Sequence, residues 1–454
     1  MSNGILPGYL KLAKPNPAEN RAPWYKSTAP AYAGIFLWIV FYKQLAAGTL
    51  SQSGLGLSLL ALVAAGLLCY FLYYLVPGLF GVKTGYPLYV IGSSTYGTQG
   101  GFLIPALLMG LLQFGWLGVN IAVSTEFILR AARVENVAPG TPVFIVVAIV
   151  WGLAAGIVGL KGIKYLGKVA TYLPIVPLVM LLIVFCKNVG NAGSYQPPPG
   201  GNPMVGFLAM IAMVVGFFAT AGAAGVDFGM GNRDEKDVKL GGLFGIALAV
   251  IVTGGLAIVG VAGANAANPD LQVYDFAEVI TLQGGWLAGS MFLLFAIASF
   301  APAGFSSFIA ANSIGTLFPK VNKTAAVFAG VVVSIILAVT GVTTQLVRYF
   351  GIIGASFGPI CGAMAADYLL SGRKWSGPRK GINWAGYISW AVGFVVAILP
   401  MIKPEKFGAI APAPVIAFVI GFVLYVILAK AGLEPEVVAM GSTESVQEAG
   451  GETA

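Results

Sequence analysis

The sequence contains no histidine, only three cysteines and few charged residues. Asp, Glu, Lys and Arg make up 9% of its 454 residues, whereas a soluble globular protein has about 25%. Without histidine, the chain lacks the commonest metal ligand and general base, which argues against an integral hydrolase or a metalloenzyme. Cys69, Cys186 and Cys361 lie apart in apolar stretches, so their spacing gives no disulfide framework and no metal site. We therefore expect no enzyme and no cofactor.

Hydrophobic residues make up 58% of the chain. They form continuous runs of about 20 residues rather than alternating stretches of about 10, which predicts helices and not a membrane barrel. The expected fold is an all-α integral membrane protein with twelve transmembrane helices. Their windows lie near residues 29–49, 55–80, 103–130, 141–160, 168–187, 203–226, 240–263, 286–315, 324–343, 346–370, 383–402 and 409–431.

Three regions follow from these windows: an N-terminal segment (1–28), a helical domain (29–431) and an acidic tail (432–454) that we expect to be disordered. The loops expected inside the cell carry about three Lys and Arg residues for each one outside, which places both termini in the cytoplasm. The net charge of +8 is therefore a topology signal and not a sign of nucleic-acid binding. We expect a monomer in the inner membrane, with the lipid bilayer as its surroundings.

Lys43 is the only charge between Lys26 and Lys83. A charge in hydrocarbon is costly, and it tends to mark a pathway, a coupling site or a partner carboxylate. The residue therefore directs the search for function to the first helix.

Small residues suggest interruptions in two helices. One stretch, AAGTLSQSG, ends the first window, and the other, GFFATAGAAGVDFGMGNRD (216–234), ends the sixth. Helices 1 and 6 correspond if the first ten spans form two inverted repeats of five, and broken helices in corresponding positions are typical of transporters. The alternative is that these residues only allow helices to pack closely.

Aromatic residues indicate a candidate binding site. Gln113 and Trp116 are three residues apart and so share one helical face. An amide beside an indole suits a planar heterocycle with polar edges, and Phe217 and Phe218 of the sixth helix could cover its other face. The alternative is a Trp at the lipid interface.

Four segments in order carry a family resemblance: FGVKTGYPLYVIGSSTYGTQGGFLIPALLMGLLQFGWLGVNI, GFFATAGAAGVDF, ANSIGTLFPK and FGPICGAMAADYLL. Over roughly residues 30–430 the chain resembles nucleobase-cation symporter family 1, most closely its cytosine permease branch. The resemblance implies a five-plus-five inverted repeat with broken helices 1 and 6, two further helices, and uptake by alternating access.

The resemblance also implies which residues hold the substrate. Trp116 and Phe218 would stack on the substrate ring, and Gln113 would form hydrogen bonds with the polar edge of that ring. Thr220 stands where the family has a serine, and Phe217 stands where it has a smaller residue. The full expected substrate site is Gln113, Trp116, Phe217, Phe218, Thr220, Gln44 and Gly48.

The coupling ion, H+ or Na+, is left open by the sequence. Sodium-coupled relatives use paired hydroxyls on the eighth helix, where this chain has Ala303 and Gly304. We expect Lys43 to take the place of sodium, with transport coupled to protons through Lys43, Asp227 or Glu126. One alternative is that Lys43 extends outward to water. Another is that Ser306 and Ser307 rebuild a sodium site near Lys43 and Ala303.

Other acidic residues receive structural or gating roles. Asp227 has the alternative of a structural role, in which it caps or pairs with the basic loop after the sixth helix near Arg233. The resemblance gives Asp367 a gating role or a salt bridge at the cytoplasmic mouth. We expect the acidic residues of the loop between helices 7 and 8 to be solvated; these are Asp270, Asp275 and Glu278.

The sequence thus predicts a secondary active transporter that imports a nucleobase such as cytosine or a purine. One alternative is a permease of the same family for hydantoin, allantoin or a vitamin-related pyrimidine. Another is an amino-acid permease of the same fold, although a stacked aromatic pair favours a flat neutral ring. An ion channel is disfavoured because the sequence has no repeated filter or charged ring.

Overall fold

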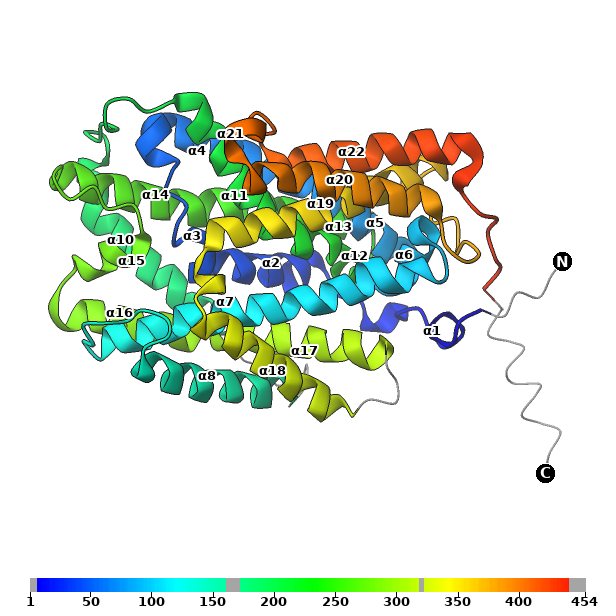
Figure 1. Ribbon diagram of the computed structural model, residues 1–454, viewed down its shortest axis with the longest axis horizontal. Coiled ribbons are helices and arrows are strands. Elements are labelled where there is room, and N and C mark those ends of the chain that lie inside the picture. Colours follow the sequence, from blue (N-terminus) through cyan, green and yellow to red (C-terminus); the bar gives the residue numbers. More distant parts are fainter. Residues whose placement is uncertain (1–5, 161–171, 318–321, 441–454) are drawn as a thin grey trace.

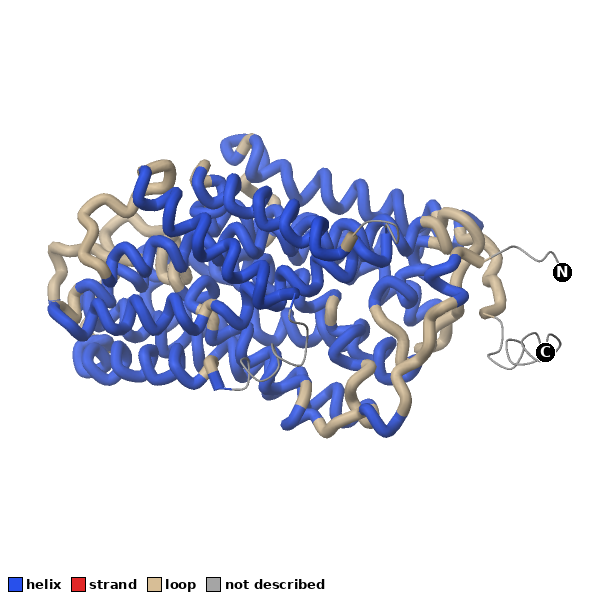
Figure 2. The backbone as a smooth tube through the Cα atoms, turned by 90° about the horizontal axis from the view of Figure 1, so that it is seen from below, coloured by secondary structure: helices blue, strands red, loops and turns tan. Residues whose placement is uncertain are grey.

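The fold is helical throughout the part of the chain that the structure, a computed structural model, describes. It describes residues 6–160, 172–317 and 322–440. Within these ranges the chain forms helices joined by loops, and extended pairing is confined to two isolated bridges, Ala22 with Asn232 and Arg379 with Val437. Figures 1 and 2 show the helices running side by side along the long axis of the molecule.

The first half of the chain contains α1 (Gly8–Lys11), η1 (Ala18–Asn20), η2 (Trp24–Lys26), α2 (Thr28–Leu37), α3 (Ile39–Tyr42), α4 (Leu50–Leu68), η3 (Cys69–Tyr74), α5 (Leu75–Thr84), α6 (Leu88–Tyr96), η4 (Phe102–Leu107), α7 (Leu108–Ala131), α8 (Pro142–Leu160), α10 (Ile175–Ala192) and α11 (Pro203–Ala223). The second half contains α12 (Gly225–Gly229), α13 (Glu235–Gly242), η5 (Leu243–Leu248), α14 (Ala249–Ala267), α15 (Phe276–Thr281), α16 (Gly285–Ala298), α17 (Phe300–Leu317), α18 (Lys323–Val339), η6 (Val342–Thr344), α19 (Leu346–Leu370), α20 (Trp384–Ile402), α21 (Pro404–Phe407), α22 (Ala413–Leu428) and η7 (Ala429–Leu433).

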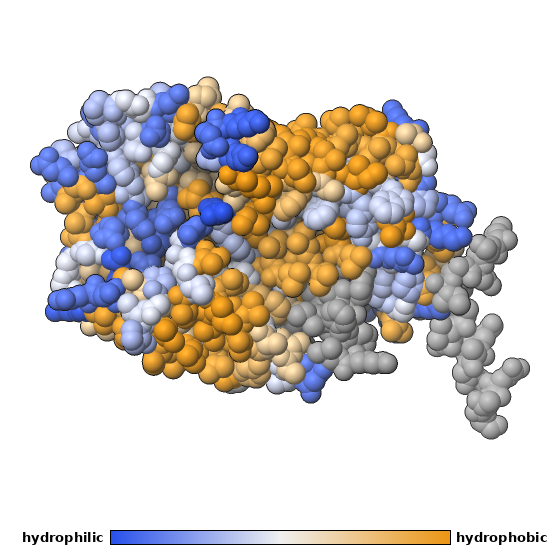
Figure 3. All heavy atoms as spheres, viewed as in Figure 1, coloured by the Kyte–Doolittle hydropathy of each residue, from blue (hydrophilic) through white to orange (hydrophobic). Residues whose placement is uncertain are grey.

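The apolar helices account for the expected membrane spans. Within the described residues, ten helices are long and apolar enough to cross a membrane, and Thr28–Leu37 and Thr324–Val339 are shorter apolar helices. A space-filling view shows apolar surface over the middle of the molecule and polar surface mainly at its two ends (Figure 3). The start of the expected fifth window, 168–171, lies outside the described residues. The chain is thus a multi-pass membrane protein.

The helices pack in two groups. In the first group, α11 and α14 pack against α4, and α2 packs against α14 and η5. In the second group, α7, α8, α17 and α18 all contact one another. The long helix α19 packs against α11, α20 and α22, so the last two helices lie beside α19 and not between the two groups.

Two local features differ from the windows read from the sequence. Helix α6 forms between the second and third windows, where we expected only a loop. The eighth window is divided at Ser299, because the chain ends α16 there and restarts as α17. The side chain of Asn120 on α7 donates to the Ser299 carbonyl oxygen at 2.8 Å, which satisfies a backbone group at this junction.

Both ends of the described chain lie at the same end of the bundle (Figure 1). We call this the termini end; it contains α1, α6 and residues 434–438. The end that contains α15 is the opposite end. The backbone N–H of Lys380 donates to Glu436 O at 3.0 Å, and that of Val438 donates to Pro378 O at 2.8 Å. The prediction of a disordered tail is therefore wrong for these residues, while residues 441–454 lie outside the described ranges.

Candidate functional site

The first helix is interrupted at Trp38. Helix α2 ends at Leu37, and Trp38 adopts an extended conformation (φ −68°, ψ 127°) before α3 begins at Ile39. Turns follow from Lys43 to Thr49, with Gly48 at φ +71°, a conformation that glycine adopts without strain. This first interruption lies before the AAGTLSQSG stretch (46–54), and the stretch is itself irregular, with turns up to Thr49 and with Gly54 at φ +69° and ψ 176°.

Within the predicted stretch 216–234, the sixth helix is continuous up to Ala223 and divides at Ala224. Helix α11 runs to Ala223, and only Ala224 separates it from the short α12. Its glycines allow close approach of neighbours instead: a Cβ on Gly216 would lie 2.5 Å from Phe350 O, and one on Gly222 would lie 2.6 Å from Tyr73 Cβ. The small residues up to Ala223 thus serve helix packing, while the division between α11 and α12 falls at Ala224, within the predicted stretch 216–234.

Five aromatic side chains meet between α3, α7, α11 and α19. Their members are Trp38, Trp116, Phe217, Tyr349 and Phe350, and we call them the aromatic cluster. The Trp116 ring lies 5.3 Å from Phe217 and 5.2 Å from Tyr349, both edge to face, and 5.9 Å from Trp38. Such geometry stabilises aromatic pairs beyond their buried area. The cluster is the place where the first, third, sixth and tenth spans come together.

Phe217, and not Phe218, lies against Trp116. Phe218 instead stacks on Phe36 at 5.5 Å and contacts Tyr32 at 5.7 Å. In this structure the ring in contact with Trp116 is therefore Phe217, edge to face, and not the Phe218 expected opposite it. Adjacent helical residues differ by about 100° in direction, so the two phenylalanines cannot serve the same face.

Polar groups adjoin the aromatic cluster. The Trp116 indole Nε1–H donates to Thr220 Oγ1 at 3.2 Å, which joins α7 to α11. The Gln113 amide Nε2–H contacts Met109 Sδ at 3.6 Å, a weak interaction within α7. Both Gln113 and Thr220 are buried. The Thr220 hydroxyl thus lies at the Trp116 indole, whereas the Gln113 amide contacts Met109, one turn before it on α7.

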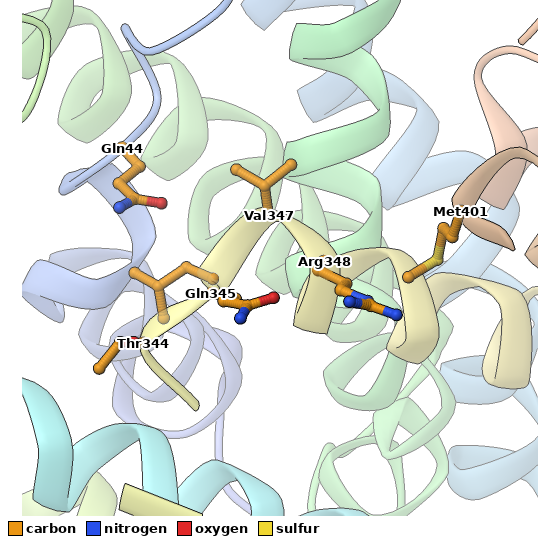
Figure 4. Close-up of a pocket in the computed structure, with 7 residues that line it drawn as sticks. Gln44, Thr344, Gln345, Val347, Arg348 and Met401 are labelled. Carbon is orange, nitrogen blue, oxygen red and sulfur yellow. The ribbon is translucent and has the colours of Figure 1, made fainter. Parts of the chain in front are cut away.

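Gln44 and Gly48 lie outside the aromatic cluster. Gln44 lines an open cavity of about 430 Å³ with Gln345, Arg348 and Met401, and its amide lies toward Gln345 (Figure 4). Gly48 supplies a turn. The structure therefore separates these two predicted substrate residues from Trp116.

Lys43 belongs to a network of charges at the opposite end. Its ammonium Nζ lies 2.6 Å from Asp275 Oδ2 and 3.5 Å from Glu126 Oε2. Arg130 pairs with Glu126 at 3.0 Å and with Glu278 at 2.6 Å. We call these five residues the Lys43 network. It joins the turn after α3 to α7 and to α15.

The Lys43 network corrects two expectations. Lys43 does not extend outward to water, since only 6% of its surface is exposed. Asp275 and Glu278 are not simply solvated, because each makes an ion pair. The docking of α15 is reinforced by its backbone: the Phe276 N–H donates to Lys43 O at 2.8 Å.

The candidate sodium residues lie on α17. The Ser307 hydroxyl donates to Ala303 O at 3.1 Å, and Ser306 is buried. The ion-pair partners of Lys43 belong to α7 and to the N-cap of α15, so they do not lie on this helix. A separate cavity of about 30 Å³ lies between the interruption at Trp38 and the α16–α17 junction at Ser299.

A second set of charges lies at the termini end. Arg379 Nη1 lies 2.8 Å from Asp367 Oδ1, and the hydroxyls of Ser94 and Thr95 donate to Asp367 Oδ2 at 2.6 and 3.0 Å. Arg379 also pairs with Glu434 at 3.0 Å. Burial is the largest single influence and would lower the pKa of Arg379, but Asp367, Tyr425 and Glu434 together outweigh it, so the pKa is raised. We call these five residues the Asp367 network.

Asp227 does not pair with Arg233. The carboxylate Oδ1 of Asp227 accepts the backbone N–H of Leu88 at 3.1 Å and so ties α12 to α6. Arg233 pairs with Asp237 at 2.7 Å instead. The expected pair with Arg233 is therefore not formed, whereas the contact with the first residue of α6 is a structural role of the kind expected for Asp227.

Sequence reasoning missed three members of the aromatic cluster. Trp38, Tyr349 and Phe350 stand in apolar windows, where an aromatic residue gives no sign of which neighbour it faces. Only a three-dimensional arrangement brings residue 38 to residues 116 and 350. The nearest available signal was that Trp38 lies five residues before Lys43, the only charge between Lys26 and Lys83.

Comparison with known proteins places the chain in a family. The model for "Permease for cytosine/purines, uracil, thiamine, allantoin" matches residues 15–427. The cytosine permease of Escherichia coli (strain K12) is 24% identical over 338 residues, which cover 72% of this chain and 75% of that protein. The cytosine permease of Escherichia coli O157:H7 matches to the same extent.

Solved structures share the fold. The inward-facing conformation of Mhp1 has a TM-score of 0.71 at 18% identity and covers 96% of this chain and 97% of its own. Mhp1, a nucleobase-cation-symport-1 family transporter, in a closed conformation with bromovinylhydantoin bound has a TM-score of 0.68 at 18% identity, with 95% and 98% covered. A Na+-coupled sialic acid symporter has a TM-score of 0.57 at 13% identity, with 92% of each chain covered.

The resemblance inferred from four sequence segments is therefore confirmed, and so is the expectation that the chain is a transporter and not an enzyme. The match covers both groups of helices and the whole aromatic cluster. This chain belongs to the family of permeases for cytosine/purines, uracil, thiamine and allantoin, the nucleobase-cation symporters.

Proposed function

We propose that this permease imports a nucleobase such as cytosine or a purine, and that the ring binds at the aromatic cluster. The observation that carries the proposal is Trp116, whose indole is fixed by its hydrogen bond to Thr220 and faces Phe217. Aromatic surfaces suit a flat ring, and the buried Gln113 amide and Thr220 hydroxyl can read its polar edge. The family membership and the cytosine permease relatives support the same class of substrate.

Binding requires the cluster to open. Trp116 and Phe217 touch edge to face, with their ring centroids 5.3 Å apart, and both are buried. A substrate ring that stacks on Trp116 must displace Phe217 or turn it. We propose that this rearrangement accompanies the change between conformations, since broken or displaced helices line the substrate site in such transporters.

The two charge networks are the proposed gates. We propose that the termini end faces the cytoplasm, in agreement with the excess of Lys and Arg expected there. The Lys43 network would then close the outer side and the Asp367 network the inner side. Alternating access requires that the ion pairs of one network break while those of the other network stay intact.

The helix packing supports an inverted repeat. One group of helices comes from spans one, two, six and seven, and the other from spans three, four, eight and nine. Each group therefore takes two consecutive spans from each set of five. In this proposal, with twelve spans in all, the turn at Ala224 is the counterpart of the interruption at Trp38.

A related heterocycle is the second candidate. Phe217 fills space where the family has a smaller residue, and a reshaped pocket would favour hydantoin, allantoin or a vitamin-related pyrimidine. An amino acid fits less well, because the cluster presents rings and neutral polar groups and has no paired charges of opposite sign.

For the coupling ion, we propose that sodium is not required. Ala303 and Gly304 offer no hydroxyls, and the Lys43 ammonium supplies a fixed positive charge beside Glu126 and Asp275. A carboxylate released from Lys43 when the outer side opens could take up a proton. Uptake into liposomes with sodium replaced by potassium should continue unchanged, and strict dependence on sodium contradicts the proposal.

Ligand binding tests the substrate class. The melting temperature of detergent-purified protein should rise with a nucleobase and not with amino acids, because a ligand that binds only the folded state stabilises it by mass action. Trp116→Ala should abolish the rise. Trp151→Ala, which removes a buried tryptophan of α8 outside the cluster, should lower stability but keep the response. A nucleobase response that persists in Trp116→Ala contradicts the site.

A further inference from the structure

Trp38 carries a buried hydrogen-bond donor that has no acceptor. Its Nε1 is one of a small set of buried polar atoms without a partner in the described part of the chain; the others are Arg21 Nε, Tyr96 OH, Thr125 Oγ1 and Asn232 Nδ2. Only 9% of the Trp38 surface is exposed. A buried tryptophan N–H usually finds a partner, since its desolvation is otherwise uncompensated.

The two tryptophans of the aromatic cluster differ in this respect. Their ring centroids are 5.9 Å apart. Trp116 Nε1 donates to Thr220 Oγ1, whereas Trp38 Nε1 donates to no protein group. The fold therefore provides a hydrogen-bond acceptor for the indole N–H of Trp116 but none for that of Trp38. Both rings belong to the cluster where the substrate ring is proposed to bind.

The helix interruption fixes the position of Trp38. Its backbone is extended, and its N–H donates to Ile35 O at 3.3 Å, while the Phe41 N–H donates to Trp38 O at 2.9 Å. These bonds hold the residue between α2 and α3. Its ring centroid lies 5.9 Å from that of Trp116 and 6.5 Å from that of Phe217, so it belongs to the aromatic cluster, and Trp38 also lines the cavity of about 30 Å³ beside it. A donor held in this way is preorganised for a ligand.

We propose that the Trp38 indole N–H donates a hydrogen bond to an oxo group of the transported ring, which makes Trp38 a specificity-determining residue. The inference rests on the proposed function, and it narrows the substrate class to oxo-substituted heterocycles. An indole N–H is a donor only, so its partner must be an acceptor. An exocyclic oxygen projects from the ring edge, and an amino group at the same position would leave two donors facing each other.

Ring pairs that differ in an oxo group provide the test. The pairs are cytosine with 4-aminopyrimidine and hypoxanthine with purine, measured by equilibrium binding to the detergent-purified full chain. The wild-type protein should prefer the oxo member of at least one pair. Trp38→Phe keeps an aromatic ring but removes the N–H, and it should weaken binding of that oxo member by about tenfold while leaving its partner nearly unchanged.

A matched control separates this effect from a general loss of packing. Trp151 of α8 is also buried, and its Nε1 donates to Asn120 Oδ1 at 3.1 Å. Trp151→Phe therefore removes a buried indole N–H outside the aromatic cluster. It should leave the affinity ratio of each pair at the wild-type value. The ratio is measured within one variant, so a smaller folded fraction does not alter it.

The outcomes distinguish the inference from the proposed function. If the wild-type protein binds neither member of either pair, the proposed nucleobase function is wrong. If it binds them without preference for an oxo member, or if Trp38→Phe keeps the wild-type ratio, only the role of Trp38 is overturned. A water in the neighbouring cavity of about 30 Å³, which Trp38 lines, would then be the acceptor.

Discussion

The charge networks at the two ends of the molecule are built differently. In the Asp367 network the side chains of Asp367 and Arg379 are 2% and 6% exposed, and hydroxyl groups satisfy the second carboxylate oxygen. In the Lys43 network the partners are more accessible, with Asp275 at 25% and Glu278 at 44%. Buried pairs are expensive to break, whereas exposed pairs contribute little. We therefore expect that opening the termini end costs more free energy than opening the opposite end.

The largest expected effect is at Asp367. Asp367→Asn removes the charge that Arg379 faces and should destabilise the protein by about 3 kcal/mol, because a buried guanidinium is left with less compensation. Thermal or denaturant unfolding in detergent measures the loss. Glu434, which also pairs with Arg379, limits the cost. A variant as stable as the wild-type protein would show that opening the termini end does not cost more free energy.

Asp275→Asn should have an intermediate effect and act locally. Asn retains the N-cap that Asp275 provides to the Ala277 N–H, but it lacks the charge that pairs with Lys43. We expect about a fivefold increase in hydrogen exchange of α15, equivalent to about 1 kcal/mol for a partly exposed pair. Mass spectrometry of peptides over residues 275–284 makes the measurement. Unchanged exchange there would mean that backbone contacts alone hold α15.

Glu278→Gln should have the smallest effect. Its pair with Arg130 lies at the more exposed side of the Lys43 network, and Arg130 keeps Glu126 as a second partner. We expect a change in stability within about 0.5 kcal/mol and less than a twofold change in exchange of α15. An effect as large as that of Asp275→Asn would show that the five charges act as one unit.

The helices and the family could be predicted from the sequence, because both depend on local patterns. Apolar runs of spanning length give the helices, and four ordered segments give the resemblance. Trp116 and Thr220 were also predicted, and the structure joins them by a hydrogen bond. The sequence could not show where within 216–234 the sixth helix divides. A glycine that breaks a helix and a glycine that allows a neighbouring backbone to approach look alike in sequence.

What the sequence determined by itself is the class of molecule: a helical membrane permease with a charge in its first span and aromatic residues in its third and sixth. Tertiary structure decided which groups meet. It placed Phe217 and not Phe218 on Trp116, and it paired Lys43 with Asp275 across 232 positions. It also left the indole N–H of Trp38, next to Trp116, without a partner. The physical reason is that hydropathy and helix period are properties of neighbouring residues, whereas the direction of a side chain and its partner depend on how separate helices pack.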